Sequence, residues 1–320
     1  MSGRLSALRL GTSWLRRALL EPELPLTAVE VRPRNLGVVR LVRERGRLRL
    51  GAAASVDLPE GVLKLAMTEP NVLEPESLRR ALESLLERAG ARGESRIGLV
   101  LPDPVVRVAL LPLTELGAVR RRDLDETARF RLRKVLPFEA REARVATLLP
   151  RGGAASTAVV AAVFRPVLEG YESALASLGL HPGLVEVACL ALTALGGDAP
   201  VDRLLVNWDH GYVSLVLTRA GWPVLLRTLA GEYVTRPELV AREVANTVLY
   251  YRERLGGSGL AGALVRSAAL DTQEAVALLA EPLGFAPEVL DPWAPLGIEH
   301  GDMAAQAVAG AAACVLRRAA

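Results

Sequence analysis

The chain has 320 residues, of which 51% are apolar, and its 39 basic residues nearly balance its 36 acidic ones. This length suits two domains with separate cores, and the even charge excludes a large nucleic-acid footprint. The two cysteines, Cys189 and Cys314, lie in apolar stretches and are too few for a disulfide framework.

Two further features indicate a cytoplasmic protein. The longest apolar run, 304–316, contains Gln306 and is shorter than the ~20 residues that a membrane-spanning helix needs. Arginines interrupt the first 20 residues, where a signal peptide would be apolar.

The first half begins with a segment, 1–25, that is predicted to be either a basic amphipathic helix or a flexible terminus. Strands follow at 26–31, 36–43 and 47–54, with Gly46 in the last hairpin. Pro75 begins a helix that ends at Gly90. The elements after it are a strand at 96–101, a strand at 105–111, a long helix over 114–136, strands at 143–149 and 157–164, a helix over 166–178 and a strand at 184–187.

Residues 198–200 are predicted to mark a domain boundary, because the opening pattern recurs after them. Strands are expected at 204–207, 213–219 and 224–229, then helices at 237–255, 272–283 and 303–318 with strands at 263–266 and 288–290 between them. Glu30 precedes Gly46 by 16 residues, and Asn207 precedes Gly221 by 14. We therefore expect a duplicated α/β unit over 26–197 and 198–320.

Three antiparallel strands followed by helix–strand crossings are typical of the actin-like ATPase fold of the ribonuclease H-like class. In that fold the nucleotide lies between the two halves, and the turn after each first strand holds phosphate. The turns after the strands at 26–31 and 204–207 are therefore the candidate phosphate loops.

Four stretches resemble the PilM family of type IV pilus assembly proteins, in the family's order. Residues 130–139, FRLRKVLPFE, are similar to a helix that ends in "YIPF", and 157–171 resemble a "VLVVAAP" strand with its following helix. Residues 178–182 match a "GLKP" turn, and 284–293, GFAPEVLDPW, are similar to "GIPVEVLNPF". The resemblance implies an actin-like fold with an inserted subdomain, of the type shared with the cell-division protein FtsA, at about 104–165.

The nucleotide motifs depart from the family pattern. The first loop, "DIGSSSVK" in the family, places Glu30 at the aspartate, Arg32 at the glycine and Gly37 at the lysine. In the second, "DIGASTTN", Asn207 replaces the metal-directing aspartate and Asp209 replaces the glycine. The adenosine-side "SGGGA" becomes 266–270, so Ser267 and Ala268 stand at glycine positions. Bulk and a carboxylate at these turns predict a nucleotide site that stays empty.

The resemblance implies a cytoplasmic adaptor at the inner membrane, in a type IV pilus or a type II secretion-like machine. Its expected partners are the N-terminal peptide of a PilN-like inner-membrane protein and other assembly components. The peptide would lie in a groove between the first domain and its inserted subdomain, at or near the stretch Leu132, Val135, Leu136, Pro137 and Phe138. The side chains of Leu132, Val135, Leu136 and Phe138 are equally candidates for the core, and the core is the favoured interpretation for any one of them.

Two alternatives remain at the sequence level. An active ATPase or phosphotransferase with divergent loops would need ATP and magnesium. An FtsA-like membrane scaffold would self-associate into filaments. We expect no other chemistry, because the chain has no Walker A loop, no catalytic triad and no metal-ligand spacing among its three histidines.

Overall fold

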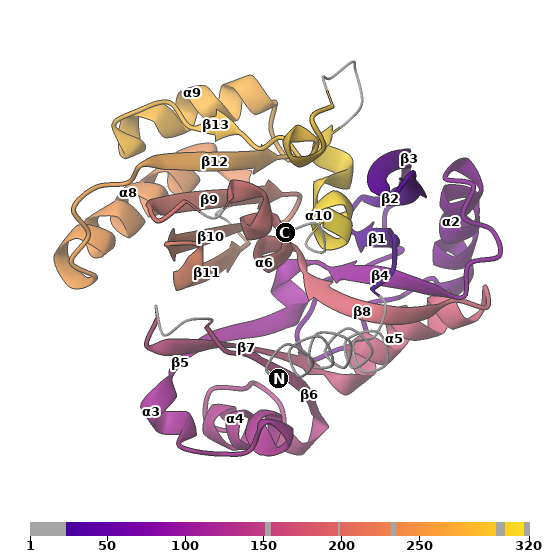
Figure 1. Ribbon diagram of the computed structural model, residues 1–320, viewed down its shortest axis with the longest axis horizontal. Helices are drawn as coiled ribbons and strands as arrows, with labels where there is room; N and C mark the ends of the chain where they lie inside the picture. The colour runs from indigo at the N-terminus through magenta and orange to yellow at the C-terminus, as the bar shows by residue number, and fades with distance from the viewer. Residues whose placement is uncertain (1–23, 151–154, 198, 232–234, 299–304, 317–320) are drawn as a thin grey trace, which may run out of the picture.

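The computed structural model describes residues 24–150, 155–197, 199–231, 235–298 and 305–316. A first five-stranded sheet has the order β3-β2-β1-β4-β8 (Figure 1). Its strands are β1 (Thr27–Val31), β2 (Asn35–Glu44), β3 (Arg47–Asp57), β4 (Arg96–Leu101) and β8 (His181–Val187). β1 lies antiparallel to β2 and parallel to β4, and β4 lies parallel to β8.

A second five-stranded sheet repeats this topology in the order β11-β10-β9-β12-β13. Its strands are β9 (Asp202–Asp209), β10 (Tyr212–Arg219), β11 (Trp222–Ala230), β12 (Gly262–Ser267) and β13 (Glu288–Val289). β9 occupies the place of β1, antiparallel to β10 and parallel to β12. The duplicated unit predicted from the sequence is thereby confirmed.

Helices cover the outer faces of both sheets. On the first sheet they are α2 (Pro75–Arg88) and α5 (Arg165–Ala176), and on the second α8 (Pro237–Arg254) and α9 (Thr272–Leu283). α9 illustrates the local signals, because Asp271 accepts hydrogen bonds from the backbone N–H groups of Gln273 and Glu274 and Gly284 ends the helix at φ 80°. Leucines at helical spacing bury the inner face of α2.

Two helices lie between the sheets, α6 (Ala188–Thr193) and α10 (Ala305–Leu316) (Figure 1). α6 follows the last strand of the first sheet and packs against β9 and β10 of the second. α10 follows the second sheet but packs on β1, β2 and β4 of the first, where Val308, Ala312 and Val315 join Ala28 and Val39 in one core. The two halves therefore exchange their last helices.

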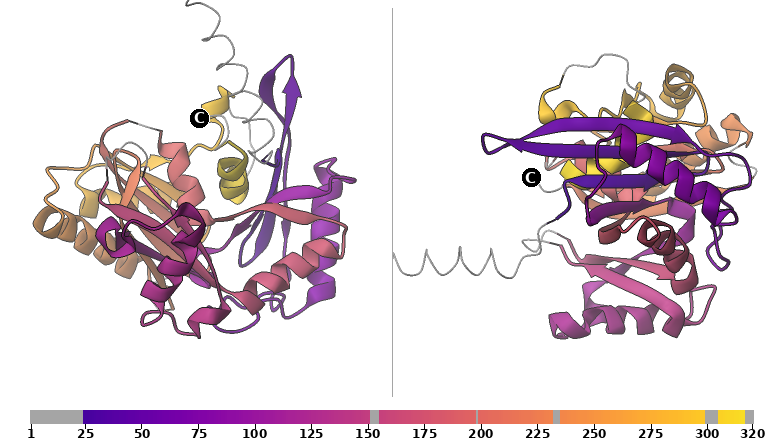
Figure 2. Two further views of the ribbon diagram at one scale, coloured as in Figure 1. Left: turned by 60° about the horizontal axis from the view of Figure 1, so that its bottom comes forward. Right: turned by 90° about the vertical axis from the view of Figure 1, so that its right-hand side faces the viewer.

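A smaller three-stranded sheet sits beside both large sheets (Figures 1 and 2). Its order is β5-β7-β6, with β5 (Val106–Pro112), β6 (Ala143–Leu148) and β7 (Thr157–Phe164) all antiparallel. Trp222 of β11 donates a hydrogen bond to the carbonyl of Thr157, which ties this sheet to the second large one.

The prediction of one long helix over 114–136 was wrong. The structure has α3 (Leu113–Leu116), a 3-10 turn at Arg121–Asp123 and α4 (Leu124–Leu132). Gly117 ends α3 with φ 65°, in the left-handed region that breaks a helix and favours glycine. Gly117, about one turn into the predicted helix, therefore ends the short helix α3.

The predicted domain boundaries can be compared with the structure at three points. Asp198 and most of the segment 1–25 lie outside the described residues. Among the described residues between β11 and β12, the only helix or strand is α8. The limits at 26–197 and 198–320 remain a prediction, and α10, which sequence order assigned to the second half, packs on the first sheet. Within the described part of the chain, no helix is both long and apolar enough to span a bilayer.

Candidate functional site

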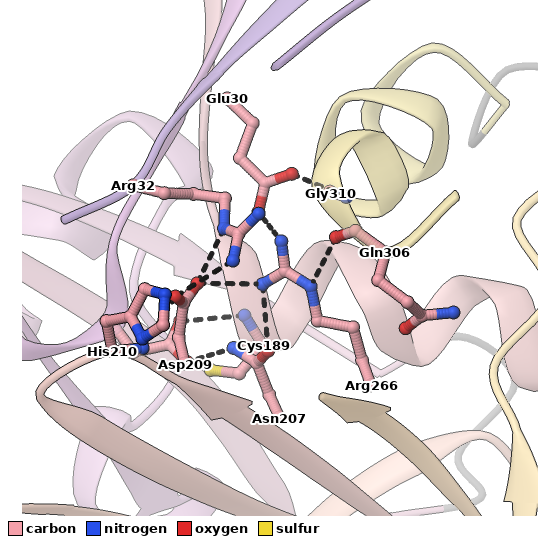
Figure 3. A network of polar contacts seen from close by, with 10 residues as sticks. Glu30, Arg32, Cys189, Asn207, Asp209, His210, Arg266, Gln306 and Gly310 are labelled. Atoms are coloured by element: carbon pink, nitrogen blue, oxygen red, sulfur yellow. Dashed lines mark hydrogen bonds and ion pairs between the residues drawn. The ribbon is translucent and has the colours of Figure 1, made fainter. Parts of the chain in front are cut away.

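Six polar side chains meet where the carboxyl ends of the central strands of the two large sheets face each other, and Figure 3 labels five of them. We call them the intersheet cluster: Glu30, Arg32, Asp103, Asn207, Asp209 and Arg266. Each is at most 2% exposed. They converge because side chains alternate across a strand: Val206 and Trp208 of β9 face the outer core of the second sheet, so Asn207 and Asp209 face the first.

The shortest contact of the cluster joins Arg32, in the turn after β1, to Asp209 at the end of β9. Nε and Nη2 of Arg32 donate to the two carboxylate oxygens of Asp209 at 2.7 and 2.9 Å. Burial disfavours the charged carboxylate, but Arg32 and Arg266 outweigh it and lower the pKa of Asp209 to about 2. Asp209 is therefore an ionised, fully paired group rather than a free carboxylate.

Arg266, near the end of β12, makes four hydrogen bonds, of which the one to Glu30 joins the two sheets. Its Nη2 donates to Oε1 of Glu30 at 2.9 Å, and its Nη1 donates to Asn207 at 3.0 Å and to Asp209 at 3.2 Å. Its Nε donates to the backbone carbonyl of Gln306 in α10 at 2.9 Å. A fully buried guanidinium with these partners is held in one orientation.

Glu30 connects the cluster to α10. Its Oε2 accepts a hydrogen bond from the backbone N–H of Gly310 at 2.8 Å, and a Cβ on Gly310 would lie 2.5 Å from Cδ of Glu30. Complete burial raises the pKa of Glu30, although Arg266 and Arg32 oppose that shift. The carboxylates of Glu30 and Asp209 are matched in number by the guanidiniums of Arg32 and Arg266.

Asp103 extends the cluster to α6. Its Oδ1 accepts from the backbone N–H of Cys189 at 2.7 Å, at the start of that helix, and its Oδ2 accepts from Nδ2 of Asn207 at 2.8 Å. Burial raises the pKa of Asp103, while the hydrogen bonds from Cys189 and Asn207 work against that rise. Asn207 thus bridges Asp103 and Arg266 through its side-chain amide.

The structure places the seven predicted nucleotide-site residues in three ways. It brings Glu30, Arg32, Asn207 and Asp209 into contact through one network. Gly37 lies instead under α10, where a Cβ would come 2.3 Å from the carbonyl oxygen of Ala307. Ser267 donates its hydroxyl to the nearby carbonyl of Leu270, and Ala268 donates its backbone N–H to the carbonyl of Trp208 in the neighbouring strand β9.

Sequence reasoning left Asp103 and Arg266 out of the site. Asp103 stands between two prolines directly after the buried strand β4, a position from which a side chain reaches the carboxyl edge of the sheet. Arg266 was noted only as the residue that begins a degraded motif. Ala263 and Val265 of the same strand lie in the outer core of the second sheet. Because side chains alternate along a strand, Arg266 was to be expected on the opposite face, toward the first sheet.

A second feature is a groove of about 440 Å³ between the first large sheet and the three-stranded sheet. One wall is the edge of β8, at Leu184, Val185 and Glu186, and the other is the edge of β6, at Arg144 and Val145. In the described part of the chain β8 pairs only with β4 and β6 only with β7, so each wall has a strand edge without a neighbour. Asp125 and Glu172 also line the groove.

The stretch predicted to contact a partner does not line this groove. Leu132 and Leu136 are buried in the core beneath α4, and Phe138 packs on that core with its ring 5.0 Å from that of Phe164. Val135 is 52% exposed on the outside of the subdomain. The predicted groove residues are thereby corrected for Leu132 and Leu136, whose burial leaves them no partner-facing surface.

The described residues contain no group of three or more His, Cys, Asp or Glu side chains arranged to hold a metal ion. His210 follows Asp209 and donates its backbone N–H to that carboxylate at 2.7 Å. Burial lowers the pKa of His210. The charge of Asp209 opposes this shift, while the charges of Arg34 and Arg32 add to it.

No protein-family model and no curated protein matches the chain. Among solved structures, it is similar to a chain of a PilM–PilN type IV pilus biogenesis complex, with a TM-score of 0.75 and 21% identity over 92% of this chain and 99% of that one. It is also similar to a Bacteroides thetaiotaomicron protein of actin-like ATPase fold and unknown function, with a TM-score of 0.50 and 6% identity over 82% and 88%. The chain has a PilM-like, actin-like ATPase fold.

Proposed function

We propose that this chain, built on a PilM-like fold, is an adaptor that holds other proteins together and does not hydrolyse ATP. It would act at the cytoplasmic face of the inner membrane in a type IV pilus or type II secretion-like assembly machine. Its ligand would be the cytoplasmic N-terminal peptide of a PilN-like inner-membrane protein.

The observation that carries the loss of ATPase activity is the intersheet cluster. Phosphate sites in this fold need backbone N–H groups that are free to meet an anion. Here the side chains of Arg32 and Asp209 occupy the two turns and bond to each other. A triphosphate would have to separate these paired charges, and breaking a buried ion pair costs about 3–5 kcal/mol.

The groove between β8 and β6 supports peptide binding without any hydrolysis. An extended peptide that adds to a free strand edge gains main-chain hydrogen bonds, and side-chain pockets supply specificity. Val185 is 37% exposed on the β8 wall and gives such a peptide an apolar contact. The acidic groups Asp125 and Glu172 favour a basic ligand.

Calorimetry on the purified full chain tests both parts. We expect no saturable heat with magnesium-ATP, and saturable binding of a synthetic peptide from the N-terminus of a PilN-like protein. Val185→Asp, in the groove, should weaken peptide binding at least tenfold. The matched control Val135→Asp, exposed outside the groove, should leave it unchanged. Saturable ATP binding without peptide binding would refute the proposal.

A further inference from the structure

We infer that the groove between β8 and β6 is a docking site for the chain's own N-terminal segment, residues 1–23. The inference deepens the proposed function, on which its competition arm rests. Three properties favour this occupant: the point where the chain enters the fold, the length of the segment and the charge of the groove.

The described chain enters the fold at the start of β8. A Cβ on Gly183 would lie 3.1 Å from Cγ of Pro25, and Gly183 itself lines the groove. Leu26 is held in place, because its carbonyl accepts a hydrogen bond from the backbone N–H of Leu41 at 2.8 Å. The segment before Leu24 therefore starts at one end of the groove.

The segment is long enough to reach every part of the groove. Nine residues from Arg16 to Pro25 can span up to ~30 Å when extended. The β8 wall from Gly183 to Val187 is four residues long, or ~13 Å. A segment tethered this closely has an effective concentration on the order of millimolar at the groove, so even weak intrinsic affinity would keep it docked.

The N-terminal segment and the groove are complementary in charge and in apolar content. Residues 1–23 contain four arginines, all within 1–20, and two acidic residues, Glu21 and Glu23, with Trp14, Leu15 and Leu19 among the arginines. The groove presents the acidic side chains of Asp125, Glu172 and Glu186 against one arginine, Arg144. Its floor is apolar, from Val106, Ala161 and Val163. A basic, leucine-rich strand fits both properties, since its arginines can pair with the rim.

The test follows Trp14 in the full-length protein by acrylamide quenching, with the difference between the wild type and Trp14→Phe isolating its signal. We expect a quenching constant at least threefold lower than in a free peptide of residues 1–23. Glu172→Lys combined with Asp125→Lys should restore the free-peptide value. The control Glu169→Lys, on the same helix but outside the groove, should not.

Competition supplies a second readout in the full chain. Arg16→Glu combined with Arg17→Glu should raise the affinity for the PilN-like peptide about tenfold, because the tethered competitor is weakened. If acrylamide quenches Trp14 in the full chain as strongly as in the free peptide of residues 1–23, the inference is overturned. This holds also when that free peptide binds vesicles of phosphatidylglycerol and phosphatidylethanolamine, since the segment would then have a lipid ligand instead of the groove. Protection that the groove variants do not change overturns it as well. Failure of the PilN-like peptide to bind any variant would count against the proposed function and leave the Trp14 result standing.

Discussion

Arg32 and Asp209 are 177 residues apart in the sequence and are joined by two hydrogen bonds of 2.7 and 2.9 Å. Each occupies a position where the motif that the sequence resembles carries glycine, and each would be harmful there alone. A buried arginine without a partner, or a buried carboxylate without one, costs several kcal/mol. Together they neutralise each other, so the two departures from the family pattern form one structural unit.

A double-mutant cycle tests this unit. Asp209→Leu should destabilise the protein by about 3–5 kcal/mol, because Arg32 is left buried without a carboxylate. Arg32→Met should cost less, since Asp209 keeps its contact with Arg266 at 3.2 Å. The double variant should be more stable than Asp209→Leu alone. Urea unfolding measures all three, and double-variant loss equal to the sum of the singles would contradict the coupling.

Replacing Gly310 by alanine should destabilise the protein, whereas the same replacement at most helical glycines stabilises it. Alanine in place of a helical glycine normally stabilises by about 1 kcal/mol. Here the new Cβ would meet the Glu30 carboxylate at 2.5–2.8 Å, so Gly310→Ala should destabilise by about 2–4 kcal/mol. The matched control is Gly170→Ala in α5, where the nearest atom lies at 3.6 Å and stabilisation is expected. Thermal and urea unfolding of both variants decide the point.

Acid should weaken the cluster through Asp209. Its folded pKa of about 2 lies below the ordinary 3.8, so its ionisation stabilises the fold above pH 3.8 and this stabilisation is lost as the pH falls toward 2. The difference amounts to about 2 kcal/mol. Unfolding free energies measured between pH 5 and 2 should therefore fall more steeply for the wild type than for the Arg32→Met, Asp209→Leu double variant. If the unfolding free energies of the two proteins fall in parallel with pH, the ionisation of Asp209 does not cause the loss of stability in acid.

The stretch around α4 separates core from surface. Leu132 is 1% exposed, and Leu132→Ala should cost about 2–4 kcal/mol in unfolding free energy. Val135 is 52% exposed, and Val135→Ala should change stability by no more than about 0.5 kcal/mol. Urea unfolding of the two variants checks this contrast, and similar costs would place Val135 in the core as well.

Much of the fold could be predicted from local patterns. The repeat of strand, turn and hairpin gave the duplicated unit, because period-two alternation and hairpin glycines are written within short stretches. The same alternation explains why Glu30 and Asp209 reach the intersheet cluster. The broken helix at Gly117 was missed, since an isolated glycine is tolerated in many helices and its φ of 65° depends on the packing around it.

The contacts of the site were less accessible to sequence reasoning. Arg266 and Glu30 are 236 residues apart, and nothing in either local stretch identifies the other as its counterion. The same limit applies to the groove, whose walls β8 and β6 belong to different sheets. Damaged motifs predicted that phosphate would be excluded, but only the tertiary structure shows that the replacing side chains bond to one another.

The exchange of α6 and α10 between the halves has a consequence for synthesis. While the ribosome is still making β9 to β13, the first sheet has α2 and α5 on its outer face but lacks α10 on the other. Val39, Leu41 and Val100, which α10 covers, stay exposed to solvent or to a chaperone during that time. Because α10 emerges after every strand of the second sheet, the nascent first half completes its hydrophobic core only after β13 has been made.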